Sequence, residues 1–283
     1  LNNADYLFLY RLRYCMASSL RRNHFIVRFI YQLKTDLMNM SISADINLLS
    51  IAVADWMVEL MQETLEKQDR FTLVLSGGNT PKKLNELLTT QVYKNAIDWT
   101  KVHIFFGDER FVPFADERNN AKMAFDTLLN HVPVARENIH IMQTENISPE
   151  ESANAYETIL KQYFPTFDSS NSKATTFDLV LLGVGDDGHT LSLFPGKTEV
   201  IQETEKLCTS LWLEEQNIHR ITLTHPIVNQ SAAVAFLASG SNKAQALKEV
   251  LYGVYNPAVY PSQIIKPVGE LHWFVDEAAA SLF

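Results

Sequence analysis

The residues best suited to chemistry stand together in residues 177–196. This segment is Phe-Asp-Leu-Val-Leu-Leu-Gly-Val-Gly-Asp-Asp-Gly-His-Thr-Leu-Ser-Leu-Phe-Pro-Gly. Its apolar run, 179–182, predicts a buried strand that is followed at once by glycines, two aspartates and His189. Open α/β sheets place ligands where such a strand gives way to a turn. A histidine beside a carboxylate suits acid–base work near neutral pH, so His189 and Asp187 are candidate catalytic residues.

The same segment satisfies the dinucleotide-binding pattern G-x-G-x-x-G through Gly183, Gly185 and Gly188. Two aspartates, Asp186 and Asp187, would place negative charge against the pyrophosphate of such a ligand. No clear strand ends in an acidic ribose-binding residue about 20 residues further on, and Pro195 prevents a long helix from starting there. We therefore expect no dinucleotide, and no other cofactor.

A second turn has the chemistry of a phosphate site. Residues 76–80 are Ser-Gly-Gly-Asn-Thr, between an expected strand at 71–75 and an expected helix at 81–88 that begins at Pro81. Glycines let backbone N–H groups approach an anion, and a helix N-terminus adds partial positive charge. The alternative is a plain tight turn in which a Ser or Thr caps the helix.

Two further segments offer cations after expected strands. Residues 107–110 are Gly-Asp-Glu-Arg, in which Arg110 could grip a phosphate or carboxylate. The acids Asp108 and Glu109 could hold Arg110 or a substrate hydroxyl. Three consecutive charges are otherwise typical of a solvated loop. Lys243 lies in the first turn of an expected helix, where the dipole disfavours a cation. A nearby anion would remove that conflict, and a solvated surface lysine is the alternative.

The hydrophobic pattern predicts alternating strands and helices. Strands are expected at 71–75, 102–106, 139–142, 177–182, 220–223, 232–238 and 271–275, and helices at 45–67, 81–88, 119–129, 149–163, 242–251 and briefly from Asp276. This order predicts an α/β fold with a mostly parallel sheet and helices on both faces. Because parallel strands end at one edge, the four turns can converge on one site.

Composition narrows the function classes. The chain has 283 residues, 46% hydrophobic content and a formal net charge of −9, which argues against a general nucleic-acid binder. No apolar run approaches the length of a membrane span. Cys15 and Cys208 are too few for a disulfide framework or a Cys-rich zinc site. We expect a cytoplasmic protein without a metal, nucleic-acid or membrane partner, as a monomer or small homo-oligomer.

The first 40 residues differ from the rest. They hold six Lys or Arg and two Asp, whereas the remainder holds 18 basic and 31 acidic residues. We therefore expect an N-terminal extension at 1–40 that is not part of the fold, and a catalytic domain at 41–283. The extension resembles a transit peptide in composition, and an overlong reading frame with its start at Met38 or Met40 is the alternative.

Several motifs together resemble a known family. They stand at 75–81 (Leu-Ser-Gly-Gly-Asn-Thr-Pro), 106–113 (Phe-Gly-Asp-Glu-Arg-Phe-Val-Pro), 119–124 (Asn-Asn-Ala-Lys-Met-Ala), 138–140 (Asn-Ile-His), 177–196, 220–224 (Arg-Ile-Thr-Leu-Thr) and 240–244 (Gly-Ser-Asn-Lys-Ala). The chain is similar in these to the 6-phosphogluconolactonases, whose superfamily also contains glucosamine-6-phosphate isomerase/deaminase. The resemblance covers roughly 45–283 and no part of 1–40.

This resemblance implies a Rossmann-like sheet with a small additional β region. It also implies hydrolysis of 6-phosphogluconolactone, in the oxidative pentose phosphate pathway, with a small sugar phosphate lactone as the binding partner. The catalytic residue it implies is His189, and the phosphate ligands are expected to be Ser76, Gly77, Gly78, Asn79, Thr80 and Lys243.

The expected mechanism uses His189 as the general base that activates water. Asp187 would orient the imidazole, and backbone N–H groups of the Gly185–Gly188 turn or Arg110 would stabilise the oxyanion. Other expected substrate contacts are Asp108, Gly185 and Gly188.

The chain departs from the family pattern at four places, which are Asn79, Asp186, Leu191-Ser192 and the segment Glu-Gln-Asn-Ile-His at 215–219. Two other functions remain open. A glucosamine-6-phosphate deaminase would carry Gly-His-Ile-Ala-Phe-Asn-Glu-Pro after the histidine motif, but here the residues are Gly-His-Thr-Leu-Ser-Leu-Phe-Pro. A non-catalytic sugar-phosphate sensor would need the phosphate loop without the His189–Asp187 pair.

Overall fold

The structure, a computed structural model, describes residues 39–283. Most of the expected extension, 1–40, lies outside the described residues, so it stays a prediction. Ser41–Phe283 form one compact unit, and its first strand already begins at Met40.

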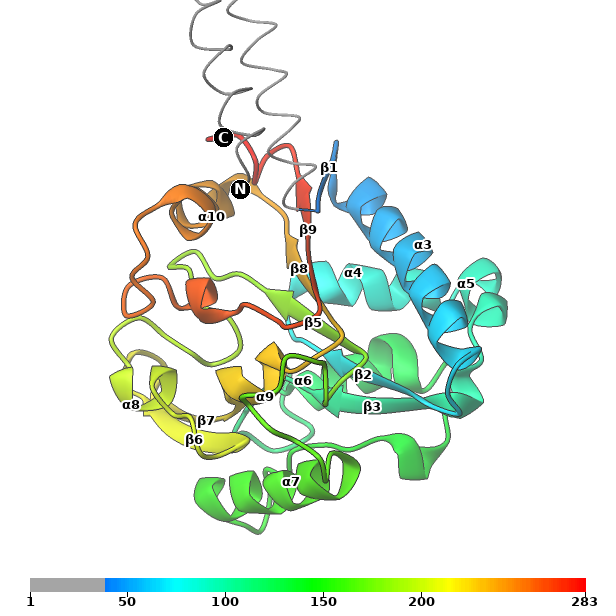
Figure 1. The fold of residues 1–283 in the computed structure, drawn as a ribbon, viewed down its shortest axis with the longest axis horizontal. Helices are drawn as coiled ribbons and strands as arrows, with labels where there is room; N and C mark the ends of the chain where they lie inside the picture. The colour runs from blue at the N-terminus through cyan, green and yellow to red at the C-terminus, as the bar shows by residue number, and fades with distance from the viewer. Residues whose placement is uncertain (1–38) are drawn as a thin grey trace, which may run out of the picture. The chain divides into compact units, whose positions relative to one another are not determined.

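The larger sheet has six strands in the order β1-β9-β8-β5-β2-β3 (Figure 1). Their bounds are β1 (Met40–Ser43), β2 (Phe71–Leu75), β3 (Val102–Phe106), β5 (Leu179–Gly183), β8 (Ala233–Ala238) and β9 (Glu270–Asp276). From β9 to β3 every neighbouring pair is parallel. The expected mostly parallel α/β sheet is therefore confirmed.

The strands form because each is a short apolar run that can be covered on both faces. Every residue of β2 and of β8 is buried, which is typical of the inner strands of a parallel sheet. In chain order, β3 is added on one side of β2, and β5 on the other. The order therefore reverses between β2 and β5, and such a reversal opens a crevice at the carboxyl ends of the strands.

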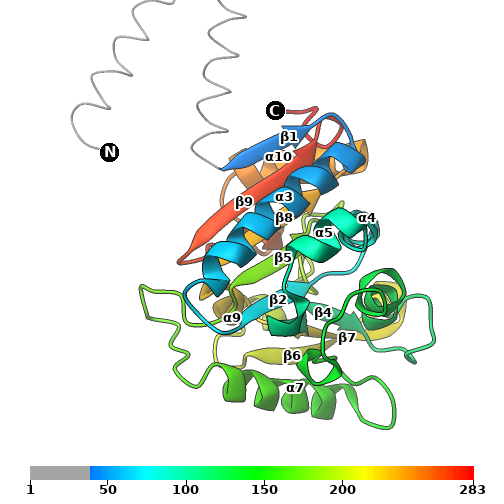
Figure 2. The ribbon, with the colours of Figure 1, turned by 90° about the vertical axis from the view of Figure 1, so that its right-hand side faces the viewer.

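Helices lie on both faces of this sheet, and others lie outside it (Figures 1 and 2). Their bounds are α3 (Ile46–Leu65), α4 (Asn79–Leu88), α5 (Gln91–Ala96), α6 (Asn120–Ala124), α7 (Pro149–Tyr163), α8 (Thr198–Ile201), α9 (His225–Asn229) and α10 (Ala244–Tyr252). Short 3₁₀ turns occur at η1 (Trp99–Lys101), η3 (Arg136–Asn138), η4 (Glu214–Gln216), η5 (Ser241–Lys243) and η6 (Pro261–Ile264). Helices α3 and α4 lie on one face of the sheet and α10 on the other (Figures 1 and 2).

Capping residues explain where the two longest helices begin. The Asp45 side chain accepts hydrogen bonds from two N–H groups in the first turn of α3. Helix α7 begins after Ser148, which forms a capping box with Glu151, and has Pro149 at its start. Both patterns satisfy N–H groups that a helix cannot satisfy internally.

A second sheet of three antiparallel strands confirms the small additional β region. Its order is β4-β7-β6, with β4 at Asp108–Arg110, β7 at Ile218–Leu223 and β6 at Cys208–Leu213. Figure 2 shows α7 running beside this sheet. A turn was expected at 107–110, but its last three residues form strand β4 because they pair with β7. This pairing places Arg110 opposite Arg220.

Three other expectations about elements are corrected. No strand forms at 139–142, where Ile139 makes only a single bridge to Ile104 at the edge of the sheet. The helix expected at 119–129 is an α-helix only over α6 (Asn120–Ala124). The chain then forms a wider π-helical turn, η2 (Phe125–Leu129). No helix follows Asp276, because its carboxylate accepts N–H groups from Ala279 and from Gly240 and so closes a turn.

A continuous hydrophobic core lies between the large sheet and helices α3, α4 and α6. Its largest fully buried side chains include Trp99, Phe71, Phe106 and Met57. Within residues 39–283, no helix has the length and apolarity needed to cross a membrane.

Candidate active site

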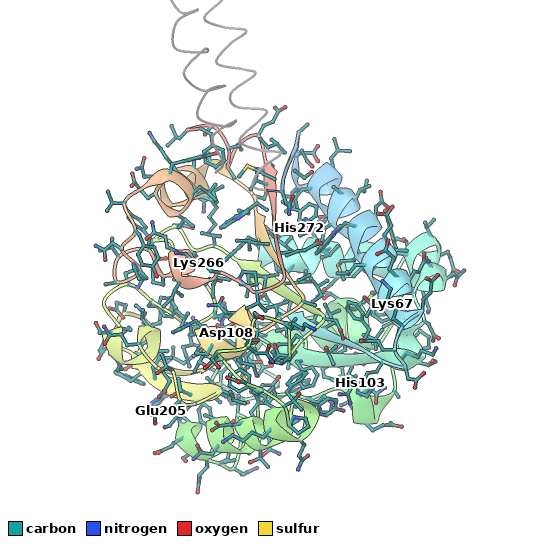
Figure 3. The ribbon with its side chains drawn as sticks, in the orientation of Figure 1. Lys67, His103, Asp108, Glu205, Lys266 and His272 are labelled. Atoms are coloured by element: carbon teal, nitrogen blue, oxygen red, sulfur yellow. The ribbon has the colours of Figure 1, made fainter. Side chains whose placement is uncertain are left out.

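A cavity of about 220 Å³ opens at the carboxyl ends of β2 and β5. Eight of the predicted site residues line it, namely Ser76, Gly77, Gly78, Asp108, Arg110, Gly185, His189 and Lys243. Sequence reasoning did not assign roles to the other lining residues, Gly183, Val184, Thr190, Leu191 and Arg220. Asp108 lies near the middle of the ribbon, whereas Glu205 lies at its periphery (Figure 3).

Four predicted site residues do not line this cavity. Asn79 faces a neighbouring hollow of about 400 Å³, which shares Gly78 and Arg110 with the cavity. Thr80 lines neither of these spaces. Asp187 does not line the cavity but contacts His189, which does, and Gly188 lies against Tyr260.

The turn after β5 holds the histidine in one position. Gly185 N–H donates to the His189 carbonyl at 2.8 Å, and Gly188 N–H donates to the Gly185 carbonyl at 3.0 Å. A Cβ added to Gly185 would lie 2.0 Å from Nδ1 of His189 and 2.5 Å from Oδ1 of Asp187. Only glycine therefore allows the backbone to approach this pair so closely.

Asp187 fixes the protonation pattern of His189. Its Oδ1 lies 2.5 Å from the Nδ1 of His189 and also accepts the His189 backbone N–H at 3.0 Å. Burial raises the pKa of Asp187, but the hydrogen bond and charge of His189 outweigh it, so the pKa lies below its usual value. A carboxylate that accepts from Nδ1–H leaves the lone pair on Nε2, where a general base needs it.

The expected oxyanion donors at Gly185 and Gly188 are corrected by these hydrogen bonds. Both N–H groups already serve the turn itself, so they are not available to a substrate oxygen. The expected donors that remain are the N–H groups of Asp186 and Asp187 in the same turn, and Arg110. Nη1 of Arg110 donates to the Arg118 carbonyl at 2.8 Å, and no carboxylate among residues 39–283 pairs with Arg110.

Arg220 is a charged residue of the cavity, and no role was predicted for it from the sequence. Only 4% of it is exposed, its Nη2 donates to Gln216 at 2.7 Å, and its Nη1 lies 3.4 Å from the Asp108 carboxylate. Burial lowers the pKa of Arg220, and the charge of Asp108 partly restores it. Ser192 also donates to Asp108, at 2.7 Å. The signal that could have found Arg220 is its place at the head of the quoted motif at 220–224.

Glu109 has a structural role between its two charged neighbours. Its carboxylate is 1% exposed and accepts backbone N–H groups from Arg110, Asn120 and Ala121 at 2.7–2.8 Å. It therefore joins β4 to the first turn of α6. Burial raises the pKa of Glu109 to about 7 although these hydrogen bonds oppose the change, and the charge of Asp108 adds to the rise. None of these contacts involves the Arg110 side chain, so they do not support the prediction that Glu109 holds Arg110.

The glycine turn leaves the N-terminus of α4 open. Gly78 precedes this helix with a φ of 106°, and no side chain caps the helix N-terminus. The alternative of a Ser or Thr cap is therefore wrong. Ser76 instead donates its hydroxyl to the Leu181 carbonyl at 2.7 Å, which joins β2 to β5. Gly77 lies so close to Asn120 that an added Cβ would stand 1.9 Å from its Oδ1. Uncapped N–H groups beside small residues suit an anion.

Lys243 already has an anion beside it, supplied by the protein. It ends η5 and immediately precedes α10, and its ammonium pairs with Oδ1 of Asp186. Asn242 donates to the same oxygen at 3.0 Å. The hydrogen bond from Lys243 is the main reason that the pKa of Asp186 lies below its usual value, although burial opposes it.

Unpaired polar atoms gather at this cavity. Among the described residues, four buried side-chain atoms lack a hydrogen-bond partner, and three of them belong to lining residues, Arg110 Nε, Arg220 Nε and Thr190 Oγ1. Native proteins rarely leave such atoms unpaired. Their concentration here is typical of a site that is built for a polar ligand. No group of three His, Cys, Asp or Glu within the described part of the chain could hold a metal ion.

The chain is similar in sequence and in fold to proteins of one family. Residues 44–273 match the family described as glucosamine-6-phosphate isomerases/6-phosphogluconolactonase. A relative from Nostoc sp., named 6-phosphogluconolactonase, is 39% identical over 227 residues, which cover 80% of this chain and 90% of the relative. The structure of 6-phosphogluconolactonase from Trypanosoma brucei has a TM-score of 0.76 at 26% identity and covers 86% of this chain and 97% of its own.

A deaminase shares the fold but not much sequence. The structure of a monomeric glucosamine-6-phosphate deaminase has a TM-score of 0.72 at 18% identity and covers 87% of this chain and 100% of its own. At that identity the likeness concerns the fold alone. The match over 44–273 and the identity to the Nostoc relative are stronger, and by them the chain belongs to the glucosamine-6-phosphate isomerase/6-phosphogluconolactonase family.

Proposed function

We propose that this protein is a 6-phosphogluconolactonase, which hydrolyses 6-phospho-D-glucono-1,5-lactone to 6-phosphogluconate. One observation carries the proposal. The His189–Asp187 pair stands at the same cavity as the N-terminus of α4, Lys243 and Arg110, which has no carboxylate partner within residues 39–283. An ester that carries a phosphate needs these groups together. The names of the relatives support the same substrate.

The phosphate of the substrate is assigned to the glycine turn and Lys243. Backbone N–H groups at Gly77, Gly78 and the start of α4 would donate to its oxygens, and the Lys243 ammonium would balance its charge. Binding energy gained at this remote group then holds the lactone carbonyl in position for attack. Asn79 and Thr80 do not line the cavity, so neither side chain is assigned a phosphate contact.

Hydrolysis begins with a water molecule between His189 and the lactone carbonyl. Nε2 of His189 takes a proton from this water while the water oxygen bonds to the carbonyl carbon. The carbonyl oxygen becomes an oxyanion, for which Arg110 is the assigned donor. Asp187 stabilises the imidazolium formed at this stage, because its carboxylate holds Nδ1–H.

The second step returns the proton. The tetrahedral intermediate collapses, the bond between the carbonyl carbon and the ring oxygen breaks, and the electron pair of that bond goes to the ring oxygen. His189 donates its Nε2 proton to the ring oxygen, which becomes a hydroxyl. The carboxylic acid so formed loses its proton to water at neutral pH. One histidine thus serves both steps, and the enzyme is restored.

A lactonase assay tests the proposal directly. Glucose-6-phosphate dehydrogenase supplies the lactone, and the rate of lactone loss is compared with spontaneous opening in the same buffer. We expect the protein to exceed the spontaneous rate, and His189→Ala to fall by about 10²- to 10⁴-fold, the usual contribution of a general base. A His189→Ala variant as active as the parent would reject this mechanism.

Two further measurements separate the rival functions. Release of ammonia from glucosamine 6-phosphate would favour a deaminase, which shares this fold. Tight binding of the lactone without turnover would favour a sensor. The placement of an oriented histidine at the phosphate cavity favours the lactonase over the sensor, because a sensor needs no proton acceptor there.

A further inference from the structure

We infer that Asp186 competes with the substrate phosphate for Lys243 and thereby sets the affinity of this site for phosphate esters. The inference rests on the proposed function, in which Lys243 is a phosphate ligand. It adds that the ligand must displace a carboxylate of the protein before the lysine can bind it.

The contacts of Asp186 carry the first step of the argument. Oδ1 of Asp186 accepts from the Lys243 ammonium and from Asn242 Nδ2. These two donors are neighbours in η5, at the carboxyl end of β8, whereas Asp186 lies in the turn after β5. The carboxylate therefore connects the end of β5 to the end of β8 and pairs with the ammonium that the phosphate would have to contact.

The distribution of charge at the cavity carries the second step. Two of the three lysine and arginine residues that line it are paired, Arg220 with Asp108 and Lys243 with Asp186. The pairs differ in burial, because the Asp108 side chain is 10% exposed and the Asp186 side chain 62% exposed. An exposed carboxylate can leave for water at little cost, whereas a buried one cannot. The Lys243–Asp186 pair is therefore the exchangeable one.

The chemistry of the ligand carries the third step. A phosphate monoester is close to a dianion at neutral pH and offers three acceptor oxygens. It can replace a single carboxylate oxygen at the ammonium, but its charge repels the adjacent Asp186. The observed affinity is then lower than the intrinsic affinity of Lys243 for phosphate. Binding breaks the Lys243–Asp186 ion pair, and the freed Asp186 carboxylate repels the phosphate. Asp186 consequently weakens the binding of small anions such as inorganic phosphate.

Two probes and one matched control test the inference. Isothermal titration calorimetry measures the affinity of the whole protein for 6-phosphogluconate and for inorganic phosphate, neither of which turns over. We expect Asp186→Asn to bind both about two- to fivefold more tightly at low ionic strength, the range given by an exposed ion pair, and less so at high salt. Asp186→Ser should behave alike.

The control variant is Glu214→Gln. Glu214 forms a comparable exposed pair with Lys197, its side chain is 64% exposed, and neither residue lines the cavity. Removing that charge should leave phosphate affinity unchanged. In a Lys243→Met background the gain from Asp186→Asn should largely disappear, because no ammonium remains for which to compete.

Two results would overturn the inference. Unchanged affinity in Asp186→Asn means that the pair does not oppose the ligand, and weaker affinity means that Asp186 instead orients Lys243 for binding. Equal gains in Asp186→Asn and Glu214→Gln would likewise reject it, in favour of a general effect of net charge. Lactone turnover is measured separately, so a protein without lactonase activity rejects the proposed function, whereas an active protein with unaltered phosphate binding rejects only this inference.

Discussion

Oδ1 of Asp187 accepts both the ring Nδ1 and the backbone N–H of His189, at 2.5 Å and 3.0 Å. The two contacts place the imidazole in one orientation and one tautomer. Nε2 has no hydrogen-bond partner among residues 39–283. The ring packs against Phe194, with centroids 4.3 Å apart, which limits its rotation. The histidine is therefore held by its neighbours in sequence before any ligand arrives.

Asp187→Asn should lower kcat by about 10²- to 10⁴-fold, a loss like that of the base itself. The amide keeps the size of the side chain but removes the charge that stabilises the imidazolium of the first step. Steady-state kinetics on the lactone measure the change, with Glu214→Gln as the control that removes a carboxylate outside the cavity. A kcat within twofold of the parent would show that the carboxylate does not assist His189.

Lys243→Ala should raise KM and leave kcat within a few-fold. A charge-assisted hydrogen bond contributes about 1.5–3 kcal/mol, which corresponds to about a 10- to 150-fold change in affinity. Lys248→Ala is the matched control, since Lys248 is an exposed lysine of α10, the helix that Lys243 immediately precedes. If Lys243→Ala lowered kcat and left KM alone, the lysine would act at the carbonyl and not at the phosphate.

Arg110→Ala should lower kcat by about 10²- to 10³-fold, the usual cost of removing one oxyanion donor. The positive charge of Arg110 is not balanced by a carboxylate within the described residues, so it remains available to a developing oxyanion. Arg118→Ala serves as the control, because Arg118 is exposed and already paired with Asp116. A rise in KM with an unchanged kcat would reassign Arg110 to the phosphate.

The buried carboxyl of Glu109 should make stability depend on pH. Its pKa in the folded protein is about 7, raised chiefly by burial from an ordinary value of 4.5. The folded state therefore holds this proton more firmly than the unfolded state does between these two values. The stabilisation is fully present below about pH 4.5, is lost as the pH rises through 7, and amounts to about 3 kcal/mol at most.

Urea unfolding at several pH values between 5 and 8 measures this contribution, with Glu109→Gln as the comparison. The variant should be less stable at low pH, because its amide group meets the N–H of Ala121 or Asn120 without accepting it. Its stability should also fall less than that of the parent as the pH rises. Parallel curves for the two proteins would mean that Glu109 is already ionised throughout this range.

Some elements could be predicted from the sequence because local signals define them fully. β2 and β3 are short apolar runs that end in glycine-containing turns, and α7 carries its own capping box. The structure has all three with the predicted bounds. β4 could not be predicted, because Asp108, Glu109 and Arg110 form a strand only through pairing with β7, more than 100 residues away. The apolar segment at 139–142 shows the opposite case. It makes only a single bridge, from Ile139 to Ile104, and therefore does not form a strand.

The candidate site divides in the same way. Residue type and spacing alone determined that His189, Asp187, the glycine turn and Lys243 could act together, since parallel strands end at one edge. Only the tertiary structure decided that the N–H groups of Gly185 and Gly188 donate within their own turn. It also decided that Arg220 lines the cavity and that Asp186 forms an ion pair with Lys243. Hydrogen bonds and ion pairs between distant turns depend on distances of a few ångströms, and spacing along one chain does not contain those distances.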